Sequence, residues 1–171
     1  MQYNIHPLFV HFPIALLFIY SIMKILPLRR IFPRVSWKHI ENIFLLLGVL
    51  GAFAAIYTGG IARHLFSTQS QIVRVHSQFA SISAWLYGLL LFGELLTFLA
   101  PTNFFKSKLS QINPLLLFVQ EILTNPFVST ILAILGLIAI TITGMLGGVI
   151  VYGLSADPVA PFVLNLLGLN L

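Results

Sequence analysis

The chain has 171 residues, of which 58% are hydrophobic and only 8% are charged, and its mean hydropathy is +1.00. A soluble core of this size could not bury so much apolar surface, so an integral membrane protein is predicted. Cysteine is absent, which excludes disulfides, thiolate ligands and iron–sulfur clusters. The formal charge of +5 would suggest nucleic acid in a soluble protein, but these basic residues lie beside apolar runs and are better explained as topology signals.

Four apolar stretches are long enough to cross a bilayer as helices, which takes about 20 residues. They are residues 8–26, 40–62, 75–100 and 127–153. Helices are required here, because an open sheet edge could not satisfy its backbone in lipid. We therefore predict an all-α fold, a single transmembrane domain over residues 1–171 that forms a four-helix bundle.

Basic residues are distributed unevenly over the connections, and the positive-inside rule converts this into a topology. Seven lie on or beside the first and third connections: Lys24, Arg29, Arg30, Arg34, Lys38, Lys106 and Lys108. Only Arg63 and Arg74 lie on the second. The first and third connections are predicted to be cytoplasmic, with both termini on the outer side. We also expect an amphipathic helix over residues 104–123 on the inner surface and an outer interfacial tail over residues 154–171.

With this topology, four of the five histidines fall at the outer ends of the helices: His6, His11, His64 and His76. His39 lies at the inner end and is interpreted as an interfacial residue. His11 and His76 are the strongest candidate ligands, because each lies in the first turns of a span, where a polar group is costly unless paired. The alternative for each histidine is a structural role at the membrane interface.

A haem fits this donor set better than a single metal ion does. Zinc and copper sites recruit three or more ligands, and Asp157 is the only outer-side carboxylate. A haem needs one imidazole on each face of its iron, apolar walls and basic groups for its propionates. The sequence therefore predicts His11 and His76 as axial ligands and Arg63 and Arg74 as propionate partners, with His6 and His64 as a reserve pair.

Two helices carry small-residue stripes that a cofactor could approach closely. The members are Gly48, Gly51, Ala55 and Gly59 on the second span, and Gly136, Gly144, Gly147 and Gly148 on the fourth. Such stripes more often mean helix-on-helix packing.

One face of the third span is predicted to point into the bundle. Glu94 lies eighteen residues after His76, about five helical turns, so both share a face with Ser83 and Tyr87. Glu94 is interpreted as snorkelling to the inner interface, with proton movement as the alternative.

Three segments together resemble the membrane-protein family known as domain of unknown function 2231: "HPLFVHFPIALL", "VHSQFASISAW" and "GMLGGVIVYG". The resemblance implies a four-helix membrane domain associated with electron-transfer components and suspected of binding haem, which maps to His6, His11 and His76. The expected location is the inner (cytoplasmic) membrane of a prokaryote, as a multi-pass protein.

Two functions of different classes follow from these patterns. The first is a non-enzymatic electron-transfer subunit, a bis-histidine b-type cytochrome that passes electrons between an outer-side redox partner and quinone or a partner subunit. The second is a cofactor-free structural subunit of a larger respiratory or photosynthetic membrane complex.

An enzyme is not expected, because the sequence shows no nucleophile–base pair, paired carboxylates or phosphate-binding loop. Solute transport is less favoured, because no inverted repeat is visible. In either role we expect an oligomer or complex subunit.

Overall fold

The computed structural model describes residues 5–65, 70–102 and 113–169, and this part of the chain is built from helices without a strand. Four of the helices are long and apolar enough to cross a membrane: α1 (His6–Ile25), α3 (Trp37–Leu65), α4 (Gln71–Leu99) and α7 (Pro126–Tyr152). The all-helical fold and the four candidate spans are thus confirmed. The helices run past the predicted spans at several ends, because hydropathy detects only the apolar part of a helix that continues into the membrane interface.

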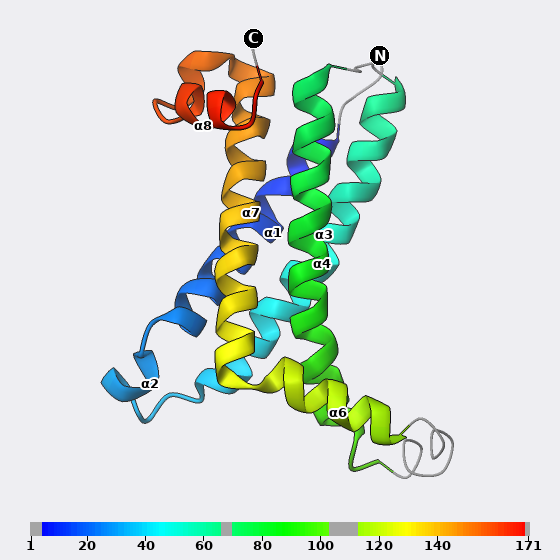
Figure 1. Cartoon of the computed structure of the whole chain (residues 1–171), viewed down its shortest axis with the longest axis vertical. Coiled ribbons are helices and arrows are strands. Elements are labelled where there is room, and N and C mark those ends of the chain that lie inside the picture. The colour runs from blue at the N-terminus through cyan, green and yellow to red at the C-terminus, as the bar shows by residue number, and fades with distance from the viewer. Residues whose placement is uncertain (1–4, 66–69, 103–112, 170–171) are drawn as a thin grey trace.

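The long helices form two antiparallel pairs (Figure 1). Helix α1 packs most extensively on α3, and α4 on α7, while α3 also borders α4 and α1 borders α7. This arrangement places α1 and α4 diagonally across the bundle. Each pair is a hairpin whose first helix begins, and whose second helix ends, at the same end of the molecule.

Short helices mark the two ends of the bundle. Helices α2 (Leu28–Ile31) and α6 (Asn113–Thr124) lie at one end, which we call the basic-loop end (Figure 1). The 3₁₀ turn η1 (Leu154–Ala156) and α8 (Ala160–Leu166) lie at the other, which we call the histidine end. Helix α6 covers the second half of the amphipathic helix predicted over residues 104–123, and the first half lies outside the described residues. The orientation of the two ends in a membrane remains a prediction.

Close helix approaches hold the bundle together. Leu17, Leu45, Ala84 and Ala133 are fully buried at its centre. Gly48 of α3 lies directly under Leu17, where a Cβ atom would come within 2.5 Å of the Leu17 Cδ2 atom. Small residues matter in lipid because helix association there depends on van der Waals packing rather than on the hydrophobic effect.

A polar contact crosses the centre of this apolar core. The Ser21 Oγ atom of α1 hydrogen-bonds to the Leu17 carbonyl at 2.9 Å and to the Tyr87 hydroxyl of α4 at 2.7 Å. Tyr87 is fully buried, and its ring lies against Gly136 of α7. The predicted inward face of α4 is confirmed, because Ser83 and Tyr87 are both buried.

Candidate functional site

His6 lies in the first turn of α1 and is held against α3. Its Nδ1 atom is 3.2 Å from the Thr58 hydroxyl, and the imidazole also interacts with the backbone of Ala55. The Thr58 hydroxyl proton is directed to the carbonyls of Ala54 and Ala55, at 3.0 and 3.1 Å. The Thr58 hydroxyl therefore lies between the His6 ring and two backbone carbonyls, and it can hydrogen-bond to the imidazole in either direction.

His76, near the start of α4, is held against α7 in the same way. Its Nδ1 atom donates to the Thr143 carbonyl at 3.0 Å. A carbonyl oxygen only accepts, so this bond fixes the tautomer, and in the neutral ring the lone pair is on Nε2.

Both imidazoles rest on a glycine of the neighbouring helix. A Cβ atom on Gly59 would come within 3.0 Å of the His6 Cε1 atom, and one on Gly147 within 3.3 Å of the His76 Cε1 atom. Each glycine lies four residues, one helical turn, after the backbone position with which the ring interacts, Ala55 or Thr143. The two hairpins thus repeat one arrangement, which we call the glycine-seated histidines, His6 and His76.

The two glycine-seated histidines lie at the same end of the bundle on diagonally placed helices. They are within electrostatic range of each other. In both, the Nδ1 atom faces a hydrogen-bonding oxygen of the neighbouring helix, the Thr58 hydroxyl for His6 and the Thr143 carbonyl for His76. Metal-bound histidines show this pattern, because a hydrogen bond at one ring nitrogen orients the other and raises its basicity.

His11, the predicted partner of His76, has a different neighbour. It is exposed, and its Nδ1 atom donates to the Pro7 carbonyl of its own helix at 2.8 Å. Five residues along a helix rotate the side chain by about 500°, so His11 lies about 140° around α1 from His6. The structure therefore seats His6, a member of the predicted reserve pair, in the same way as His76, and it leaves His11 exposed.

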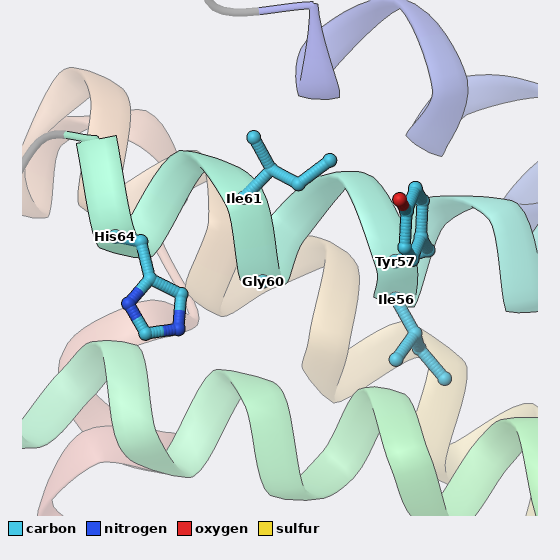
Figure 2. Close-up of a pocket in the computed structure, with 5 residues that line it drawn as sticks. All are labelled: Ile56, Tyr57, Gly60, Ile61 and His64. Carbon is cyan, nitrogen blue, oxygen red and sulfur yellow. The ribbon is translucent and has the colours of Figure 1, made fainter.

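The remaining predicted site residues lie at the surface. Arg63 and Arg74 are exposed near the histidine end, close in sequence to Gly59 and His76. His64 is also exposed and borders an open, apolar hollow of about 420 Å³ on α3, lined by Ile56, Tyr57, Gly60, Ile61 and His64. Figure 2 shows His64 and Ile56 pointing to one side of α3 and Ile61 to the other, with Gly60 leaving the space between them. The lining of this hollow is almost entirely apolar, and it contains no second histidine and no carboxylate beside His64.

A conventional multi-ligand metal centre is not found in the part of the chain that the structure describes. No group of three or more His, Asp or Glu side chains converges there.

The opposite end of the bundle holds a network of charges that the sequence did not reveal. Glu41 is only 2% exposed and accepts two bonds from Arg29, at 3.0 and 2.9 Å. Glu94 of α4 pairs with Lys38 of α3, and Lys24 of α1 lies within electrostatic range of both carboxylates. Sequence alone suggested an interfacial position for each carboxylate, and only the pairing between helices shows that Glu41 is buried.

Comparisons with protein families, with curated proteins and with solved structures find no match for this chain. The resemblance to domain of unknown function 2231 therefore stays a prediction.

Proposed function

We propose that this chain is a membrane-embedded electron-transfer subunit that holds a b-type haem between His6 and His76. The observation that carries the proposal is the repeated seating of these two imidazoles, with Nδ1 anchored on the neighbouring helix. Two helices on opposite corners of a bundle can supply one axial ligand each from their facing sides.

The surroundings of the two histidines support the same ligand. Gly59 and Gly147 have no side chain, which leaves room for the His6 and His76 rings beside the helix backbone. The apolar side chain of Ile14 on α1 lies against Gly144 of α7, one turn before Gly147. Arg63 and Arg74 are exposed near this end, where guanidinium groups could pair with propionates. A bis-histidine haem exchanges single electrons with both ligands retained, which is the chemistry that such a subunit needs.

The role of the protein in this proposal is to fix both ligands before binding. The bond to the Thr143 carbonyl selects the tautomer of His76, and the bonds to Thr58 and Thr143 hold the two rings, so little ordering is left to occur when a ligand binds. In this proposal the histidine end lies on the outer side of a cytoplasmic membrane, as the positive-inside rule predicts, and faces an outer redox partner. Quinone or a partner subunit would be the other electron carrier.

A structural subunit is the second candidate, and one observation favours it. The same imidazole bonds join α1 to α3 and α4 to α7, so the histidines could serve only to clamp each hairpin. Large apolar side chains such as Phe98 and Tyr152 are also exposed on the bundle, where lipid or neighbouring subunits would cover them.

Absorbance spectroscopy separates the two candidates. Protein purified with haem supplied during expression is expected to show a low-spin Soret band with one haem per chain. His6→Ala and His76→Ala should each abolish the low-spin spectrum, whereas His11→Ala, a matched control on the same helix, should keep it. A colourless protein that binds no added haem would support the structural subunit. If His11→Ala loses the low-spin spectrum and His6→Ala keeps it, the axial ligands are His11 and His76, the pair predicted from the sequence.

A further inference from the structure

The connection between α1 and α3 is a folded platform. The Trp37 indole donates to the Phe32 carbonyl at 2.9 Å, and the two ring centroids lie 6.4 Å apart. Arg29 of α2, near the start of the connection, donates hydrogen bonds to both carboxylate oxygens of Glu41 in α3. These contacts tie residues 27–36, which we call the basic loop, to the start of α3.

Charge on the basic loop is only partly neutralised. Arg29 is paired with Glu41, and Lys38, just beyond the loop, with Glu94. Arg30 and Arg34 are exposed and form no ion pair with any described residue. Residues 27–40 contain no acidic side chain, so these two arginines leave an uncompensated positive patch.

Exposed apolar side chains alternate with these arginines. Ile31 is 59% exposed, Phe32 54% and Val35 39%. Figure 1 shows α2 at the same end of the bundle as α6. Apolar groups at this level are stable in the acyl boundary of a bilayer, while neighbouring long cationic side chains extend to the headgroups.

We propose that the basic loop is a binding site for an anionic phospholipid, with Arg30 and Arg34 contacting the headgroup phosphate. Guanidinium groups suit this role because they present paired N–H donors to two phosphate oxygens. The adjacent Ile31, Phe32 and Val35 favour a lipid over a soluble anion, since a soluble ligand would leave them in water. The inference is independent of the haem and of which side of the membrane the loop faces.

Lipid titration of the full-length protein tests the site. The protein in neutral detergent micelles is titrated with phosphatidylglycerol, and bound lipid is counted by native mass spectrometry. Arg30→Gln/Arg34→Gln should bind about 30-fold more weakly than the unmodified chain, because each arginine near an anionic surface contributes about 1 kcal/mol and 1.4 kcal/mol is tenfold. Raising the salt concentration should weaken binding to the unmodified chain and have much less effect on the double variant.

Three controls make the result specific. Arg63→Gln/Arg74→Gln removes two exposed arginines at the opposite end and should leave the affinity unchanged. Arg30→Lys/Arg34→Lys keeps the charge and should bind more tightly than the glutamine pair, even if both variants lose some stability. Phosphatidylcholine and glycerol phosphate should compete poorly. Equal losses in the two glutamine double variants, or full competition by glycerol phosphate, would overturn the lipid site.

Discussion

Replacing Gly136 by alanine should destabilise the bundle at its centre. A Cβ atom at this position would lie 2.8 Å from Cζ of Tyr87 and 3.0 and 3.1 Å from the two Cε atoms, well inside ordinary carbon contact. The ring cannot simply rotate away, because it is fully buried and its hydroxyl is bonded to Ser21 at 2.7 Å. Overpacking of this kind costs about 1–3 kcal/mol, and weakening the hydrogen bond costs about 1 more. Alanine recovers up to about 1 kcal/mol of helix propensity, so the net loss should be about 1–3 kcal/mol.

Unfolding in mixed micelles, followed by circular dichroism as dodecyl sulfate is added, measures this loss. Gly88→Ala is the matched control, since a Cβ atom at Gly88 meets nothing within 4 Å. It should leave the midpoint unchanged or raise it. If Gly136→Ala is as stable as Gly88→Ala, the Tyr87 ring is not seated on Gly136 as described.

Three further predictions concern local contacts, each measured as the free energy of unfolding in the same assay. Asn125→Ala should lose about 1 kcal/mol, because the Asn125 side chain caps α7 by accepting from the backbone N–H groups of Phe127 and Val128, and Asn125→Ser should restore most of the loss. Arg29→Gln should cost about 2–3 kcal/mol, because it leaves the buried Glu41 carboxylate without its partner. Glu41→Gln should cost under about 1 kcal/mol, because Arg29 is largely exposed and its guanidinium returns to water. Equal costs for the two variants would contradict the described burial of Glu41. Trp37→Phe should cost about 1 kcal/mol, because it removes the hydrogen bond from the indole to the Phe32 carbonyl of the basic loop. The same variant should be cleaved faster by a protease within residues 27–36. An unchanged cleavage rate would show that this bond does not order the loop.

Much of the architecture could be predicted from the sequence because hydropathy is summed along the chain. A run of apolar residues indicates a span without knowledge of its neighbours, which is why all four helices were located to within a few residues. The inward face of α4 was also predictable, since Ser83, Tyr87 and Glu94 recur at helical spacing. The extent of the helices was less accurate, because α3 continues through polar residues at both ends that hydropathy does not count as membrane.

The candidate site was only partly predictable, for a reason visible at His6 and His11. Sequence gives both residues nearly the same depth, and His11 lies further inside the apolar run, which made it the better candidate. Contact with α3 depends on the rotation of α1, and that rotation places His6 over Gly59 and leaves His11 exposed. The "TGG" of α3 and the "LGG" of α7 were a usable signal, because each glycine pair lies close to the level of a histidine on the preceding helix of its hairpin.

The sequence by itself determined that this is a helical chain with the composition of a membrane protein, where its four apolar segments lie, and that four of the five histidines lie towards one end of these segments and seven of the nine lysines and arginines towards the other. These properties depend on composition and on distance along a helix, both of which are local. Only the tertiary structure decided which imidazoles meet, which carboxylate is buried and which arginines remain exposed. Those outcomes depend on helix rotation and pairing, which are set by close contacts such as Leu17 on Gly48 and Tyr87 on Gly136 between residues far apart in the chain.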